Sequence, residues 1–218
     1  MMRFARVASG VILGLLACAA SGQAQTPAAT ADTSRVYVAF DAAATFGHKS
    51  SGSVGAEGGY VISGPYSVFV EGGRMMNVGS QDLDDRAARI ANALGGTFSA
   101  SYKVNYFDAG IRIAPEMYWP VRPYFAVGFG VAQVRAETAI TINGTTVGPE
   151  TILFGSDLNG TEKKPFFMLG GGASYPFAQR FYADFSLRYG RIFPKTDVID
   201  NDKGINTLRA QVGVGVKF

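Results

Sequence analysis

Apolar and polar residues alternate along most of the chain with a period of two, and this pattern predicts β-strands. The C-terminus shows it most clearly. There one face carries Leu208, Ala210, Val212, Val214, Val216 and Phe218. The same test predicts eight strands, at residues 36–46, 53–63, 66–76, 101–114, 122–136, 165–177, 180–192 and 206–218. We therefore expect an all-β fold.

The two faces of these predicted strands differ in chemistry. One face is aliphatic and aromatic, whereas the other mixes glycine, serine, tyrosine and charges of both signs. This distribution is typical of a membrane barrel, in which apolar side chains face lipid and small or polar ones face the lumen. Because hydrocarbon offers no water to an open sheet edge, the sheet has to close. We predict an eight-stranded antiparallel up-and-down transmembrane β-barrel over residues 36–218, with the short connections in the periplasm and the longer ones outside.

The connections and the rim of the barrel support this arrangement. Short turns are expected at 63–65, 114–121 and 177–180, and longer loops at 77–100, 137–164 and 194–205, with 47–52 as a short member of the outer set. Aromatic residues gather near the expected periplasmic rim, where a girdle belongs. They are Tyr66, Tyr118, Trp119, Tyr175, Phe177 and Phe218.

Two of the longer loops have predicted structure of their own. Residues 82–94 show helical spacing, with Asp82 as the expected cap and Gly95 as the expected end. The apolar face of that helix consists of Leu83, Ala87, Ile90 and Leu94. Asn143 and Gly144 predict a tight hairpin turn within residues 140–147. These elements are expected to cover the barrel mouth or to dock a partner.

The first 24 residues are typical of a secretory signal peptide that is removed after export. Arg3 and Arg6 precede an apolar stretch at 7–20, and small residues mark a cleavage site after residue 24. Residues 25–35 then form a short periplasmic segment. Cys18, the only cysteine, lies in the removed stretch. Lipidation of Cys18 is the alternative, because Leu-Leu-Ala-Cys faintly resembles a lipoprotein box.

Composition narrows the function classes. The net charge of +3 offers no basic field for nucleic acid, and 47% hydrophobic residues exclude a disordered chain. The chain has a single histidine, and processing removes its only cysteine, so neither a metal site nor a cofactor is expected. The histidine, His48, stands two residues before Ser50, a spacing that faintly resembles outer-membrane lipid A deacylases.

Three stretches resemble a known family: Arg122–Val131, Gly170–Phe177 continuing into Phe185–Tyr189, and Gly213–Phe218. On these residues the chain resembles the small outer-membrane β-barrel proteins, the group related to the OmpA barrel domain and OmpX. The resemblance implies the outer membrane of a Gram-negative bacterium, with membrane lipid and lipopolysaccharide as neighbours. It also implies that Phe218 is the C-terminal signal recognised by the barrel assembly machinery. Structural barrels, adhesins and narrow pores all belong to this family.

Charged residues on the lumen face are the candidate functional site. By strand parity they are Asp41, Glu57, Glu71, Asp108, Arg112, Asp184, Arg188, Arg209 and Lys217. One interpretation is a sealed network that fixes strand register, which suits an interior only wide enough for side chains. The other is a gated polar conduit in which Arg112 or Arg188 exchanges acidic partners, and the many inward glycines keep it open.

These observations lead to three functional hypotheses. We favour a non-enzymatic envelope protein with a structural role in membrane integrity, or with a surface ligand bound by its extracellular loops. The alternative is a narrow channel for ions or small solutes. A lipid A-modifying enzyme comes third.

Overall fold

The computed structural model describes residues 35–115, 117, 119–147, 160–194 and 204–218. The predicted signal peptide with Cys18 lies outside these residues, as do nearly all of segment 25–35 and Tyr118 of the predicted girdle. No helix in this part of the chain is long and apolar enough to cross a membrane.

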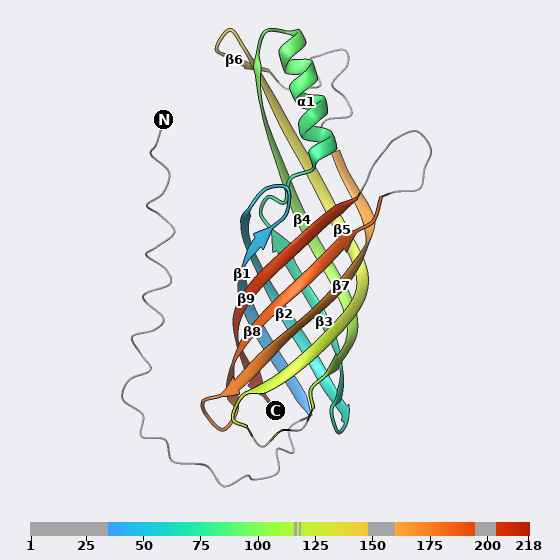
Figure 1. Ribbon diagram of the computed structural model, residues 1–218, viewed down its shortest axis with the longest axis vertical. Helices are drawn as coiled ribbons and strands as arrows, with labels where there is room; N and C mark the ends of the chain where they lie inside the picture. Colours follow the sequence, from blue (N-terminus) through green and yellow to red (C-terminus); the bar gives the residue numbers. More distant parts are fainter. Residues whose placement is uncertain (1–34, 116, 118, 148–159, 195–203) are drawn as a thin grey trace, which may run out of the picture. The chain divides into compact units, whose positions relative to one another are not determined.

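Strands dominate the described chain (Figure 1). In order, the elements are β1 (Val36–Phe46), β2 (Ser51–Ser63), β3 (Tyr66–Met75), α1 (Gln81–Ala93), β4 (Thr97–Ile113), β5 (Arg122–Ile142), β6 (Thr145–Val147), β7 (Gly160–Pro176), β8 (Phe181–Ile192) and β9 (Ile205–Lys217). All eight predicted strands are present, and β6 is a short additional strand that pairs with the end of β5.

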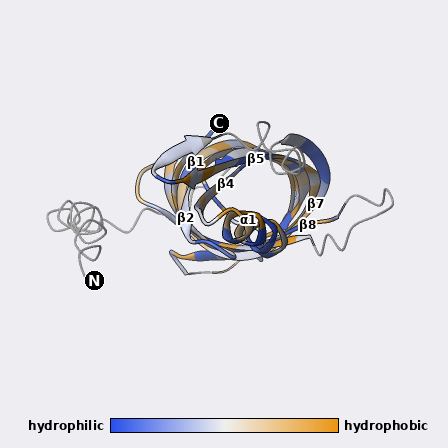
Figure 2. Cartoon of the chain, turned by 90° about the horizontal axis from the view of Figure 1, so that it is seen from above, coloured by the Kyte–Doolittle hydropathy of each residue, from blue (hydrophilic) through white to orange (hydrophobic). Residues whose placement is uncertain are grey.

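The sheet closes into a barrel. Its ring order is β4-β3-β2-β1-β9-β8-β7-β5, and β4 pairs with β5 to complete the ring. Every neighbouring pair is antiparallel, including the first and last strands, whose pairing runs from Tyr37 opposite Lys217 to Phe46 opposite Leu208. The view from above shows this closed ring (Figure 2). The predicted eight-stranded antiparallel up-and-down barrel is therefore confirmed.

Side-chain exposure follows the predicted alternation. Large apolar side chains cover the outside of the wall, and Phe40 and Phe129 are among the most exposed, at 67% and 65%. Charged side chains such as Glu71 and Arg209 are instead buried inside. This reverses the arrangement of a water-soluble barrel and suits a wall that contacts hydrocarbon. The described members of the predicted aromatic girdle are all exposed: Tyr66, Trp119, Tyr175, Phe177 and Phe218.

The two ends of the barrel differ. At one end, here called the turn end, short connections join β2 to β3 and β7 to β8. At the other, here called the loop end, β4 and β5 continue far beyond their neighbours, with pairing up to Thr97 opposite Thr141 (Figure 1). We expected loops at 77–100 and 137–164, and both are shorter because β4, β5 and β7 extend into them. Polar residues on both faces of these extensions obscure the alternation of apolar and polar residues that marks a strand at a membrane.

The Asn-Gly hairpin forms as predicted. Asn143 and Gly144 have φ values of 49° and 80°, as a type I′ turn requires, and they join β5 to β6.

Helix α1 packs on the long β4–β5 extension. Ala87 and Ala91 are buried against Ile140 of β5. Ala91 replaces Leu94 in this contact: Leu94 follows the last helical residue and is exposed. The predicted cap is also wrong, because the helix begins one residue earlier with Ser80 as its N-cap; the side chain of Asp82 lies outside the described structure. Gly95, with φ 65°, follows the helix as predicted.

Candidate functional site

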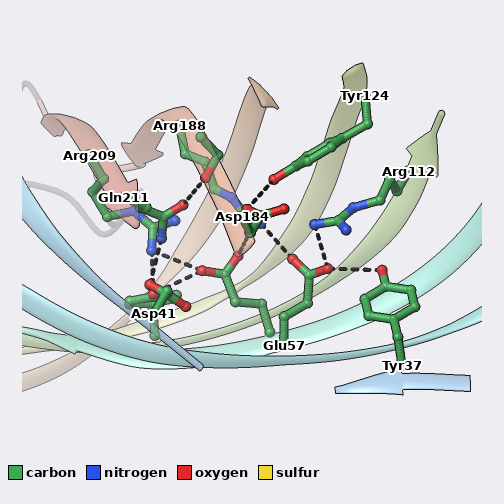
Figure 3. A network of polar contacts seen from close by, with 12 residues as sticks. Tyr37, Asp41, Glu57, Arg112, Tyr124, Asp184, Arg188, Arg209 and Gln211 are labelled. Atoms are coloured by element: carbon green, nitrogen blue, oxygen red, sulfur yellow. Dashed lines mark hydrogen bonds and ion pairs between the residues drawn. The ribbon is translucent and has the colours of Figure 1, made fainter. Parts of the chain in front are cut away.

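Buried charges join opposite walls of the barrel, with Glu71 of β3 at their centre (Figure 3). One carboxylate oxygen, Oε1, accepts hydrogen bonds from the Tyr106 hydroxyl at 2.9 Å and from Arg209 Nη1 at 3.0 Å. The other, Oε2, accepts from Arg188 Nη1. The Glu71 and Arg209 side chains are both 0% exposed. A charge buried this deeply is stable only when it is paired, and Glu71 has two guanidinium groups beside it.

These contacts span the full width of the barrel. Glu71 lies on β3 and Arg188 on β8, and these strands are four steps apart in either direction around the eight-membered ring. Tyr106 on β4 and Arg209 on β9 are also four steps apart; the Arg209 Nη1 donates to the Tyr106 hydroxyl, and its guanidinium carbon lies 4.3 Å from the ring centroid. Two direct side-chain contacts therefore cross the lumen from wall to wall.

Glu57 of β2 extends the network toward the turn end. Its Oε2 accepts from Arg188 Nη2 at 2.6 Å, and its Oε1 pairs with Arg112 Nη2 at 2.8 Å. Arg112 lies over two aromatic rings, 3.9 Å from the Tyr124 centroid and 5.1 Å from that of Tyr37. The guanidinium is therefore held by a carboxylate and by π faces at once, which fixes its orientation.

The remaining predicted acids lie around this centre. Asp184 accepts a hydrogen bond from the Tyr124 hydroxyl at 2.7 Å. Asp41 accepts from Gln211 Nε2 at 2.9 Å. Asp108 is fully buried in the strand position opposite Glu71, and neither of its carboxylate oxygens has a hydrogen-bond partner among the described residues.

Lys217 is the predicted member that lies apart. It ends β9 at the turn end, where its Nζ lies 6.0 Å from the Tyr182 ring centroid. The structure thus brings together the other eight predicted lumen charges and places Lys217 at the rim.

Four tyrosines in the lumen were not singled out from the sequence. Each lies directly across from a glycine on the neighbouring strand: Tyr37 from Gly59, Tyr106 from Gly73, Tyr124 from Gly172 and Tyr182 from Gly215. A Cβ at each of these glycines would lie 2.2–2.7 Å from an atom of the facing tyrosine. Each glycine therefore makes room for an aromatic ring. The sequence signal is an inward tyrosine in register with an inward glycine.

This pairing corrects one expectation. We took the inward glycines to favour an open conduit, but side chains from the facing wall occupy the space beside many of them. The tyrosine rings lie against four, and Arg188 approaches the Cβ position of Gly170 to 2.9 Å.

The lumen changes character toward the loop end. There its side chains are apolar and almost fully buried: Met75, Val104, Phe166, Met168 and Ile192. The alternation already placed these residues on the inward face, yet the sequence analysis did not foresee that they would form a layer. This apolar layer lies between the charged network and the loop end.

His48 and Ser50 do not form a catalytic pair. His48 Nε2 lies 3.2 Å from Asp84 Oδ2 on α1, and His48 and Ser50 share no hydrogen bond in the described chain. Lys49 Nζ binds Asp84 as well, at 2.9 Å. These contacts join the β1–β2 connection to the helix. The described residues also contain no cluster of three His, Cys, Asp or Glu that could hold a metal ion.

Comparison with known proteins settles the family. The family model for the outer membrane protein beta-barrel domain matches residues 12–218. The chain belongs to this family. As an outer membrane protein beta-barrel domain it is an integral protein of the bacterial outer membrane, and its strands carry the side chains expected of one. No protein of curated function matches the chain in sequence.

Solved structures support the same fold. The crystal structure of Neisserial surface protein A matches with a TM-score of 0.57 at 18% identity, covering 84% of this chain and 97% of that one. The N-terminal β-barrel domain of Pseudomonas aeruginosa OprF matches with a TM-score of 0.46 at 17% identity, with coverages of 84% and 97%. The outer membrane enzyme PagL matches at 0.44 and 12% identity, with coverages of 81% and 97%. Identities this low concern the fold and not the activity.

Proposed function

We propose that this barrel is a sealed, non-enzymatic membrane anchor that acts through the platform at its loop end, in membrane integrity or surface interaction. The observation that carries the proposal is the pair formed by Arg188 and Glu71, which joins diametrically opposite strands. The interior of an eight-stranded barrel is only wide enough for side chains to fill it. A solute would therefore have to separate buried, fully paired charges.

Two further layers support a closed lumen. Toward the turn end, the Tyr37 and Tyr182 rings lie against Gly59 and Gly215. Toward the loop end, the apolar layer around Met75 and Phe166 replaces polar groups that a hydrated path would need. Alternation of paired charges, aromatic rings and apolar side chains leaves no continuous polar lining among the described residues.

The loop end is built as a fixed surface. Helix α1 buries Ala87 and Ala91 on the β4–β5 extension. Lys49 ties the helix to the β1–β2 connection, because its Nζ binds both Asp84 and the Ala100 carbonyl, each within about 3 Å. Seen from above, α1 falls within the outline of the ring (Figure 2). A platform held from two sides suits recognition of a surface ligand, since little ordering remains to be done on binding.

We also propose the orientation and route of assembly. Short turns and the C-terminus mark the periplasmic end in barrels of this class, which places the loop end outside. Export by a signal peptide at 1–24 fits this orientation. Phe218 is exposed, and its backbone N–H donates to the Val36 carbonyl at 2.9 Å, so the proposed assembly signal lies where the last strand joins the first.

Single-channel recording in a planar bilayer tests the sealed lumen. We expect folded, inserted wild-type protein to be silent, and a variant that truncates both sides of the central contact, Glu71→Ala with Arg188→Ala, to admit ions. Leu187→Ala is the matched control, because Leu187 is the outward neighbour of Arg188 and is exposed to lipid. Reproducible steps from the wild type that change in Arg112→Ala would contradict the proposal and establish the narrow channel instead.

A further inference from the structure

The outer face of the barrel wall has its charges at one end only. Among the described strand residues that point outward, the basic ones are Arg74, Lys103, Arg135, Lys163 and Arg191, and the one acidic residue is Glu137. All six lie at the loop end. Four of them, Arg74, Lys103, Arg135 and Lys163, occupy the four consecutive strands β3, β4, β5 and β7, and are here called the outer basic cluster.

Strand register makes this cluster contiguous. Lys103 lies directly opposite Arg135 in the β4–β5 pair. Arg74 lies opposite Asn105, two positions from Lys103, and Lys163 lies opposite Gln133, two positions from Arg135. Diagonal neighbours of this kind are about 7–8 Å apart, within reach of long side chains.

The cluster keeps a strong excess of positive charge. Glu137 binds two of its members, with Lys103 Nζ at 2.7 Å from Oε2 and Arg135 Nε at 2.9 Å from Oε1. One carboxylate therefore holds the central pair in place but neutralises only one of four cations. Directly opposed like charges repel, so Lys103 and Arg135 retain a need for further anions.

Each cation stands at the same height relative to the apolar wall. On every strand it lies four residues beyond a large outward apolar residue, with one small or polar outward residue between: Val70 before Arg74, Phe107 before Lys103, Val131 before Arg135 and Phe167 before Lys163. Four residues span about 13 Å along a strand, or about 10 Å along the membrane normal at a tilt of about 40°. Long basic side chains can bend back toward the membrane surface.

We propose that the outer basic cluster is a binding site for the phosphate groups of an anionic outer-leaflet glycolipid. The site faces sideways into the leaflet and not upward into water, so its occupant has to carry acyl chains that lie along the apolar wall below. Phosphate accepts charge-assisted hydrogen bonds from guanidinium and ammonium groups. The inference goes beyond the proposed function and shares with it only the outward orientation of the loop end.

Affinity for lipid A with and without its phosphates tests this site. The full mature chain, refolded in a zwitterionic detergent, is titrated with fluorescent bisphosphorylated lipid A and with the same lipid after dephosphorylation. We expect a clear preference for the phosphorylated lipid, which weakens as salt is added. Neutralising all four cations to glutamine should lower that affinity by roughly fivefold for each cation removed. The matched control, Arg122→Gln with Arg180→Gln at the turn end, should bind as the wild type does.

Two further arms keep the result decisive. Arg74→Gln with Lys163→Gln leaves both Glu137 ion pairs intact, so it tests the site even where the fourfold variant fails to fold. Inorganic phosphate serves as a competitor, and it should displace the lipid only weakly if the acyl chains contribute. Equal affinity for both lipids, or unchanged affinity in the double variant, would overturn the proposal. Because this assay measures lipid binding and not conductance, its outcome is independent of whether the lumen is sealed.

Discussion

Removing the charge of Glu71 should destabilise the barrel more than a typical substitution does. In Glu71→Gln, Arg188 keeps Glu57 as a partner, but Arg209 loses the carboxylate with which it forms its ion pair. Arg209 is 0% exposed, so its guanidinium would remain charged in the interior without a counterion within hydrogen-bond distance. Breaking a buried pair in this way costs about 3–5 kcal/mol. We therefore expect a loss of about 3–5 kcal/mol in the free energy of unfolding.

Urea unfolding in lipid vesicles measures this loss. The single tryptophan, Trp119, is exposed at the turn end and reports on insertion through its fluorescence. A second variant, Glu71→Gln with Arg209→Met, removes the unpaired cation and should recover part of the stability. A loss below about 1 kcal/mol for the single variant, as exposed pairs give, would refute the reasoning. So would a double variant less stable than the single one.

Three other substitutions test the two faces and the loop end. Val212→Arg puts a charge on the lipid face and should cost about 2–4 kcal/mol. Gln211→Asn, one residue away on the lumen face, should cost about 1 kcal/mol, and the reverse order would contradict the register. Gly59→Ala places a Cβ 2.2 Å from a tyrosine ring and should cost about 1–3 kcal/mol, whereas Gly58→Ala, with its nearest contact at 3.9 Å, should unfold at nearly the wild-type urea concentration. Beyond the membrane, a hydrogen bond from a lysine ammonium holds the pKa of Glu137 below its ordinary value. That carboxylate stabilises the fold above its unfolded-state pKa and ceases to as pH falls through its folded-state pKa. The difference in thermal midpoint between wild type and Glu137→Gln should therefore vanish in acid.

The sequence predicts the barrel well because the membrane imposes a simple rule on each strand. Lipid on one face and a filled lumen on the other force a period of two, and strand β1 has the predicted bounds of 36–46. The rule weakens outside hydrocarbon. In the extensions of β4 and β5 both faces meet water, the apolar signal disappears, and the strands are longer than predicted.

The candidate site is predictable only in part. Parity alone places Glu71 and Arg188 inside, since it needs no knowledge of neighbours. That they meet across the barrel depends on the ring order and on the stagger between strands, and neither is written in any one strand. Tyrosine opposite glycine is intermediate: the pairing of Tyr37 with Gly59 can be found from sequence once the β1–β2 register is known.

The charged interior also explains how this chain selects one register. A slip of one residue in any strand exchanges its two faces. In β3 a slip would bring Glu71 into lipid, and in β8 it would do the same to Arg188, at a cost that no apolar contact offsets. A slip of two residues keeps the faces but separates Glu71 from Arg209 and moves Gly73 away from the ring of Tyr106. An apolar interior would penalise neither error strongly. A sealed lumen made of charges and tyrosine–glycine pairs therefore determines strand register as well as closing the path through the membrane.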